Sequence, residues 1–198
     1  MAGTNIAIDL GTSTVTVYML GKGIVYKQAN AAVIDRLSGQ VISIGDEAAE
    51  MLEKTPETLE VIMPMRSGAV SRFDVMSIMI ERIIKDICKN SILRPNLIIS
   101  TPFGITPPDK RTVALLGCCA CAAKVSVISS TVASALGCSI DIQNPRGNMI
   151  VDIGAGTADI AIHTMGTPVK FCSVKAAGDE MDEAIMQYIK KNRGYDIG

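Results

Sequence analysis

One ten-residue pattern occurs twice in this 198-residue chain, and it constrains the fold more than any other feature. Residues 5–14 read NIAIDLGTST and residues 148–157 read NMIVDIGAGT, at an offset of 143 residues (148 minus 5). In each copy an alternating strand pattern follows, and then a glycine-centred turn at Gly23 or Gly166. The same unit therefore occurs twice: a buried strand, an aspartate at its end, a tight turn rich in glycine and hydroxyl groups, and a second strand.

The chemistry of this unit indicates a phosphate ligand. Small residues allow backbone N–H groups to surround an anion. An aspartate would repel phosphate directly, so its expected role is to hold a divalent cation through water, because Mg²⁺ keeps several waters and bridges carboxylates to substrate phosphates. Two facing copies, with Asp9 and Asp152 converging, would clamp a nucleoside triphosphate and Mg²⁺ from both sides. A single copy often only reverses the chain, so it is the duplication that favours nucleotide binding.

Three other kinds of site fit the sequence poorly. The Walker A pattern GxxxxGK[ST] is absent. The segment 154–156 lacks the third glycine of the dinucleotide fingerprint and precedes a strand pattern instead of a helix. The single histidine, His163, lies in a strand pattern and has no Ser–His–Asp arrangement around it.

Composition sets the broad class of protein. With 48% apolar and 20% charged residues and a formal charge of −1, the chain is not disordered and has no positive field for nucleic acid. The longest apolar run, residues 113–123, is far short of a membrane-spanning helix. The first strand is expected by about Asn5, which leaves no room for a signal peptide. We therefore expect a soluble, cytoplasmic protein with a large core.

The six cysteines are expected to be small buried thiols in a reducing compartment. Cys118 and Cys121 form a C-x-x-C pair, which raises a metal or redox role. A zinc site needs about four ligands, however, and the sequence has no second cysteine pair or histidine cluster.

Strand and helix patterns alternate along the chain, which predicts an α/β architecture. Strands are predicted at 5–8, 14–20, 24–27, 97–100 and 125–128, and helices at 45–54, 74–87, 109–123, 131–137 and 179–193. Asp74 and Asp179 are expected to cap their helices, and Gly194 to end the last one. The turn at 144–147 is the predicted boundary between two domains.

The two aspartate-glycine motifs resemble the phosphate motifs of the superfamily of actins, sugar kinases and heat-shock ATPases. More narrowly, the chain is similar end to end to the MreB family of bacterial actins. The segment AGDEMDEAI at 177–185 is the most specific match. The resemblance implies an α/β, actin-like (ribonuclease H-like) fold of mixed sheets flanked by helices. It places the first lobe at 1–144, with a small inserted subdomain at about 28–68, and an incomplete second lobe at 145–198.

The resemblance also implies a function and a set of site residues. It implies binding of ATP or GTP with Mg²⁺, and Asp9 and Asp152 would organise the metal through water. Self-association into paired filaments that direct cell shape, a place on the inner membrane surface, and contacts with the cell-wall synthesis machinery follow from it, with no nucleic-acid partner. The implied nucleotide-binding residues are Asp9, Gly11, Thr12, Ser13, Thr14, Asp152, Gly154, Ala155, Gly156 and Thr157.

One departure from the family pattern bears on catalysis. The family segment that usually reads Glu-Glu-Pro-Met is SSTV at 129–132 here, so Ser130 takes the place of the glutamate thought to position the attacking water. A neutral hydroxyl is a poor general base near pH 7, and loss of such a base typically costs about 10²–10⁴-fold in rate. The hypothesis is nucleotide binding with weakened hydrolysis, unless a neighbouring residue supplies the function. An active phosphotransferase would need a carboxylate base, and residues 129–131 offer none.

Other departures concern assembly. Ser67 and Arg72 stand where the family usually has acidic residues. The sequence stops at Gly198, so the later family segments that enclose adenosine are not part of it. An open half-sheet is expected to leave an apolar face uncovered, which invites aggregation or pairing with another chain. A non-polymerising scaffold or fragment is therefore the alternative function.

A membrane contact is a separate hypothesis. The turn at 90–95 carries two adjacent large apolar residues, Ile92 and Leu93, beside Arg94. This is the position of a membrane-inserting loop in some relatives. The alternative is that both side chains cap the core.

Overall fold

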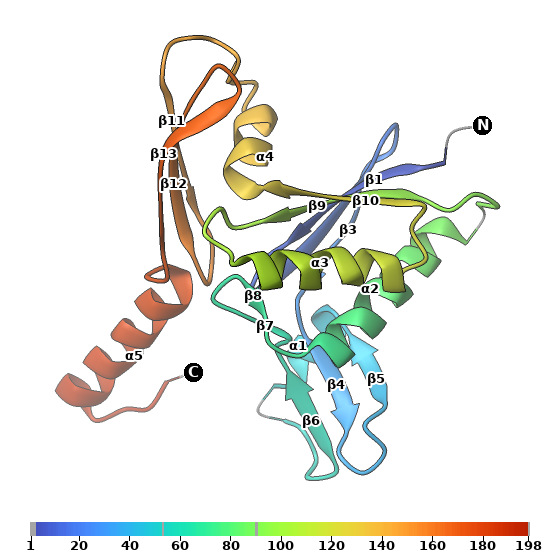
Figure 1. The fold of residues 1–198 in the computed structure, drawn as a ribbon. Helices are drawn as coiled ribbons and strands as arrows, with labels where there is room; N and C mark the ends of the chain where they lie inside the picture. Colours follow the sequence, from blue (N-terminus) through green and yellow to red (C-terminus); the bar gives the residue numbers. More distant parts are fainter. Residues whose placement is uncertain (1–2, 53, 90, 198) are drawn as a thin grey trace.

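The computed structural model describes residues 3–52, 54–89 and 91–197, and its largest unit is a mixed five-stranded sheet (Figure 1). The sheet order is β10-β9-β1-β2-β3. β1 runs parallel to β9, which runs parallel to β10, whereas β1, β2 and β3 form an antiparallel meander. The strands are β1 (Asn5–Leu10), β2 (Thr14–Met19), β3 (Gly23–Ala29), β9 (Asn96–Thr101) and β10 (Lys124–Ser129).

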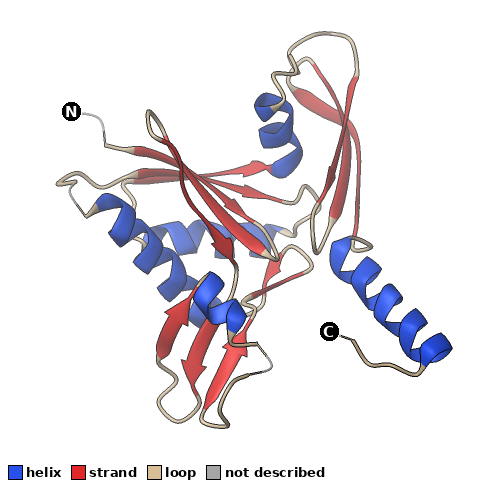
Figure 2. Ribbon diagram, turned by 180° about the vertical axis from the view of Figure 1, so that it is seen from behind, coloured by secondary structure: helices blue, strands red, loops and turns tan. Residues whose placement is uncertain are grey.

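A second sheet carries the second copy of the repeat. It is antiparallel in the order β11-β12-β13, and Figure 2 shows it standing beside the first sheet. Its strands are β11 (Asn148–Ile153), β12 (Ala158–Thr164) and β13 (Thr167–Val174). The predicted alternation of strands and helices, and the mixed sheets with flanking helices, are confirmed.

Two small sheets and a short helix lie between β3 and the long helix that begins at Phe73. β4 (Ala32–Asp35) pairs with both β5 (Val41–Ile44) and β6 (Leu59–Ile62), and α1 (Asp46–Glu50) packs against them. β7 (Met65–Arg66) and β8 (Ala69–Val70) form a tight hairpin through Ser67 and Gly68. The helix predicted at 45–54 is shorter than expected, and residue 53 lies outside the described residues.

The main core lies on one face of the five-stranded sheet, beneath two helices. Alternate residues of β1 and β2 point to this face, as the period of a strand requires. α2 (Phe73–Cys88) and α3 (Pro107–Cys119) cover it (Figure 1). The buried contacts include Ile8, Val17, Leu97, Ile80 and Leu116.

The remaining helices flank the second sheet. α4 (Ser130–Gly137) follows β10 directly and packs on β11 through Ala135 and Ile150. α5 (Gly178–Arg193) extends away from the body (Figure 1), and none of its described residues is buried. Gly194 ends α5 in the left-handed conformation (φ 73°), as predicted.

Several predicted helix limits are wrong. α2 and α5 each begin one residue before the expected aspartate cap, so Asp74 and Asp179 lie in the first turn and make no capping bond. In α2 the carboxylate of Asp74 instead accepts from Arg72, at 2.7 Å and 3.0 Å. α3 ends at Cys119 and not at 123, because Cys121 turns left-handed (φ 56°) and the Ala123 N–H pairs with the Pro95 carbonyl.

The prediction of buried thiols is also wrong. Cys118, Cys119, Cys121, Cys138 and Cys172 are exposed, and Cys88 is half-buried. The reason is clear in α3, where Val113, Leu116 and Gly117 form the buried face and the following cysteines lie outside it. Within the described ranges all six are free thiols, and none belongs to a metal-binding group of three or more ligands.

Within residues 3–52, 54–89 and 91–197, no helix combines the length and apolar character that a bilayer crossing requires.

Candidate functional site

The two copies of the repeat fold into the same turn. In the first, the N–H of Gly11 donates to the carbonyl of Thr14 at 3.1 Å. In the second, the N–H of Gly154 donates to the carbonyl of Thr157 at 2.9 Å. We call residues 9–14 turn 1 and residues 152–157 turn 2. Each joins two antiparallel strands, β1 to β2 and β11 to β12.

Each turn is anchored from outside. Asn30, which is fully buried, donates from Nδ2 to the Gly11 carbonyl and from its backbone N–H to the Ser13 carbonyl, both at 2.8 Å. The start of α5 holds turn 2 in a similar way: the Gly178 N–H donates to the Gly154 carbonyl at 3.1 Å. These bonds fix the turns before any ligand arrives, which is the preorganisation that an anion site needs.

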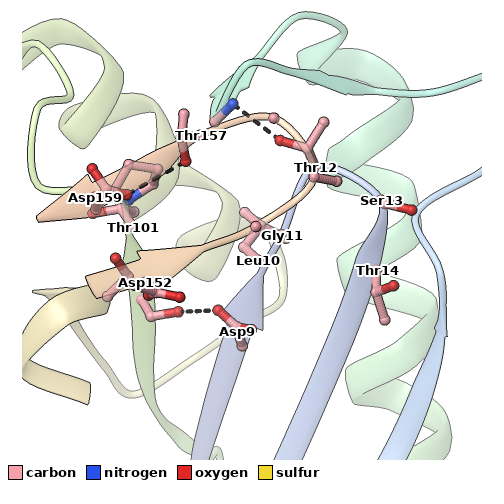
Figure 3. A pocket seen from close by; sticks show the side chains of 17 residues that line it. Asp9, Leu10, Gly11, Thr12, Ser13, Thr14, Thr101, Asp152, Thr157 and Asp159 are labelled. Atoms are coloured by element: carbon pink, nitrogen blue, oxygen red, sulfur yellow. Dashed lines mark hydrogen bonds between the residues drawn. The ribbon is translucent and has the colours of Figure 1, made fainter. Parts of the chain in front are cut away.

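The turns face one another across a narrow gap (Figure 3). A Cβ atom added to Gly156 of turn 2 would collide with Oγ1 of Thr12 in turn 1. The same Oγ1 accepts from the N–H of Gly68 at 3.0 Å, so the β7–β8 hairpin closes a third side. Gly68 and Gly156 thus both approach the hydroxyl group of Thr12, although they lie 56 and 144 positions after it in the sequence (68 minus 12 and 156 minus 12).

A cavity of about 250 Å³ lies between the two turns. All ten residues predicted to bind nucleotide line it, and so does Ser130. The ten are Asp9, Gly11, Thr12, Ser13, Thr14, Asp152, Gly154, Ala155, Gly156 and Thr157. The structure therefore brings the whole predicted set together, as Figure 3 shows for most of its members.

Two carboxylates of the cavity are held by serine hydroxyl groups. Ser100 Oγ donates to Asp9 Oδ1 at 2.6 Å, and Ser134 Oγ donates to Asp152 Oδ2 at 3.0 Å. Each aspartate keeps one carboxylate oxygen for a ligand. In the described part of the chain, no group of three or more His, Cys, Asp or Glu side chains could enclose a metal directly. Two separate carboxylates suit Mg²⁺, which usually binds one or two carboxylates, its own waters and substrate phosphates.

Ser130 is the first residue of α4 and lines the cavity. Its Oγ is shielded from solvent and has no hydrogen-bond partner among the described residues. The neighbouring Thr131 is fully buried, and its Oγ1 lies 2.9 Å from Ser129 Oγ and 3.2 Å from Nε2 of His163. Burial lowers the pKa of His163 below its ordinary 6.5. The histidine thus belongs to the packing beneath α4 and does not line the cavity.

Sequence reasoning missed several cavity residues. Ser100, Thr101 and Pro102 lie at the carboxyl end of β9, which pairs with β1. The sequence carried a signal for these three residues. Polar residues at the end of a buried strand lie at the same edge of the sheet as the end of the neighbouring parallel strand, which here leads into turn 1. Gly68 comes from a distant hairpin and had no local signal. Two further lining residues were not predicted: Leu10 in turn 1, and Asp159, which follows turn 2 by two positions.

The predicted membrane residues lie apart from this cavity. Ile92 is fully exposed and Leu93 is 43% exposed, in the loop between α2 and β9. Residue 90, at the start of that predicted turn, lies outside the described residues. The alternative that both side chains cap the core does not hold for Ile92.

Comparison with known proteins agrees with this geometry. Residues 3–198 match the family described as MreB/Mbl protein. The chain is 34% identical over 199 residues to the cell shape-determining protein Mbl of Bacillus subtilis (strain 168), covering all of this chain and 60% of that protein. It thus spans about three fifths of the length of the curated relatives it matches.

Two solved structures resemble the whole fold. MreB5 of Spiroplasma citri bound to ADP has a TM-score of 0.92 at 27% identity, covering 99% of this chain and 59% of that one. The same protein bound to AMPPNP has a TM-score of 0.89 at 27% identity, covering 100% and 60%. The mixed sheets and flanking helices are therefore those of an actin-like protein. By its sequence and its fold, the chain belongs to the MreB/Mbl family.

Proposed function

We propose that this chain binds Mg²⁺ and a purine nucleoside triphosphate between turn 1 and turn 2. The observation that carries the proposal is the convergence of both repeat copies on one cavity. Backbone N–H groups of the small residues in both turns would surround the phosphates, and Asp9 and Asp152 would hold Mg²⁺ through water. ADP and AMPPNP in the similar Spiroplasma citri MreB5 structures support an adenine nucleotide.

Calorimetry with ATP and Mg²⁺ tests this proposal. We expect one site per chain. Replacing both metal-facing carboxylates (Asp9→Asn with Asp152→Asn) should weaken Mg²⁺-dependent binding by at least about tenfold, since charge-assisted contacts typically contribute about 1.5–3 kcal/mol each. The control is Asp141→Asn, which removes one aspartate charge from an exposed turn outside the cavity. Absence of ATP binding to the unaltered chain would overturn the proposal.

We further propose that bound ATP is hydrolysed slowly, because Ser130 stands where the family has a glutamate. Its hydroxyl group lines the cavity but offers no carboxylate to take a proton from water. Ser130→Glu should raise phosphate release by about 10²-fold, the lower end of what a general base contributes. Ser130→Gln is the control, since it has the same length but no basic group. Equal rates for both variants would contradict the role assigned to this position.

The function that the relatives' names support is a part in determining cell shape, through filaments of this chain alone or with longer subunits. The rival function is a scaffold that does not polymerise. Sedimentation with ATP, with and without a full-length MreB, separates the two. Pelleting of the chain alone supports filament formation, and pelleting only with the full-length protein supports the scaffold.

A membrane contact through Ile92 and Leu93 is proposed because these adjacent apolar residues are exposed. Transfer of both side chains into lipid would contribute roughly 3–5 kcal/mol per molecule, multiplied along any filament. Ile92→Ser with Leu93→Ser should abolish flotation with liposomes. The control is Leu37→Ser, which removes another exposed leucine in a different loop. Unchanged flotation of the double variant would contradict the contact.

A further inference from the structure

A third carboxylate faces the proposed nucleotide cavity. Asp159 is the second residue of β12 and pairs in register with Asp152 of β11, so both side chains lie on the same face of the second sheet. Asp159 lines the cavity (Figure 3), as Ser130 does. Only 2% of Asp159 is exposed. A charged residue this deeply buried is normally paired.

Asp159 differs from the other two aspartates in how it is held. Asp9 and Asp152 each accept a firm bond from a serine hydroxyl, at 2.6 Å and 3.0 Å. From the described part of the chain, Asp159 accepts a single side-chain bond, from Thr157 Oγ1 to Oδ2, and at 3.4 Å that bond is weak. Its Oδ1 has no partner among the described residues, although it is shielded from solvent.

An unsatisfied buried carboxylate oxygen costs free energy, so its presence requires an explanation such as a missing ligand or water. Here the carboxylate of Asp159 lines the proposed nucleotide cavity, so we take the missing ligand to be one that enters this cavity. Of the buried side-chain atoms without a partner in the described residues, two belong to cavity-lining residues, Asp159 Oδ1 and Ser130 Oγ. The terminal torsion of an aspartate is soft. A carboxylate held by one long bond can therefore turn its free oxygen toward the cavity.

We propose that Asp159 is the general base for the residual ATP hydrolysis of this chain, in place of the absent glutamate. In this step the oxygen of a water molecule forms a bond to the γ-phosphorus, and the bond from that phosphorus to the β–γ bridging oxygen breaks. The bridging oxygen keeps the electron pair and leaves on ADP. The proton of the water passes to Asp159 Oδ1 and then to phosphate or solvent, so that ATP and water give ADP and inorganic phosphate. This inference rests on the proposed nucleotide binding.

The test is Asp159→Asn in the full 198-residue chain. Asparagine has the same shape and can still accept from Thr157, but it cannot take a proton. We expect single-turnover phosphate release to fall by about 10²-fold or more. Calorimetric affinity for AMPPNP with Mg²⁺ should stay within about threefold, because no positioning bond is lost.

Asp141→Asn serves as the matched control, because it removes an aspartate charge from an exposed turn. Asp159→Glu adds a second measurement: a base at this position should retain part of the activity that asparagine loses. Equal hydrolysis by Asp159→Asn and the unaltered chain would overturn the inference. So would ATP binding with no hydrolysis at all, which leaves the proposed nucleotide site standing. Absence of ATP binding would instead overturn the proposed function and this inference with it.

Discussion

At the scale of single residues, Gly156 decides whether the two turns can approach one another. A Cβ atom there would collide with Thr12 Oγ1 and lie 3.0 Å from the Cα of Ser67. Thr12 belongs to the wall of the cavity. The Ser67 contact is with backbone, which cannot rotate away. The requirement at this position is thus for close approach and not for an unusual backbone angle.

Gly156→Ala should therefore spread the turns and weaken ATP binding by at least about tenfold, which corresponds to about 1.4 kcal/mol. Calorimetry with Mg²⁺–ATP measures the effect. The matched control is Gly137→Ala at the end of α4, where an added Cβ meets nothing within 4 Å. Similar affinities for the two variants would show that the approach of the turns does not limit binding.

His163 predicts a pH dependence of stability. Burial lowers its pKa in the folded chain, whereas the unfolded chain takes up the proton at about 6.5. Below pH 6.5 the unfolded state therefore binds more protons, and the free energy of unfolding falls as the pH falls, until the lowered pKa of the folded state is reached. The limiting slope for one group is about 1.4 kcal/mol per pH unit.

Urea unfolding at pH 7.5 and at pH 5.5 tests this effect. His163→Gln keeps a partner for Thr131 Oγ1 but does not titrate, so its stability should fall less over the same interval. An identical fall in both proteins would assign the pH dependence to other groups.

At the scale of elements, α2 is the helix on which the core depends. Its apolar residues recur at helical spacing, and the buried ones pack on both the five-stranded sheet and the β4–β6 sheet. Met76 and Ile80 contact the first of these sheets, and Val75 and Met79 the second. The helix thus joins the β4–β6 sheet to the sheet that carries turn 1.

Ile80→Ala should lower the free energy of unfolding by about 2–5 kcal/mol, because the side chain is 1% exposed and its removal leaves a cavity. Chemical denaturation measures the loss. Leu115→Ala in α3 is the control, because that leucine is 54% exposed and should change stability by less than about 0.5 kcal/mol. Equal losses would mean that α2 is not packed as described.

At the scale of the whole molecule, each of the two main sheets has a covered face and an open face. On the first sheet, Tyr18 and Ile98 of the face opposite α2 and α3 are 45% and 43% exposed. On the second sheet, the open face includes Met149, Val151 and Ile153, exposed by 65%, 50% and 62%. Apolar surface of this extent normally marks an interaction site or an aggregation hazard.

Met149→Lys with Val151→Lys should therefore reduce concentration-dependent self-association, measured by analytical ultracentrifugation without nucleotide. Stability should change little, because both side chains are already in water. Leu37→Lys adds a charge at an exposed leucine outside the sheet faces and should leave association unchanged. Undiminished association of the double variant would assign it to another surface.

Much of this structure follows from the sequence, because the signals are local. The turns at 9–14 and 152–157 close on themselves with one backbone bond each, across four residues. The strands and helices of the chain follow from apolar residues that recur every two residues in strands and about every 3.6 residues in helices. The cavity residues that lie in the two turns could be predicted because the same short unit occurs twice.

Tertiary structure alone decided the rest. Cys118 and Cys119 are exposed because the other side of α3 faces the sheet. The local sequence pattern does not predict which side of the helix that is. Most of all, the Asp159 oxygen that has no partner among the described residues lies where β12, turn 2 and α4 line one cavity. The sequence determines which polar atoms need hydrogen-bond partners, whereas only packing between distant segments decides which of these atoms find a partner within the chain.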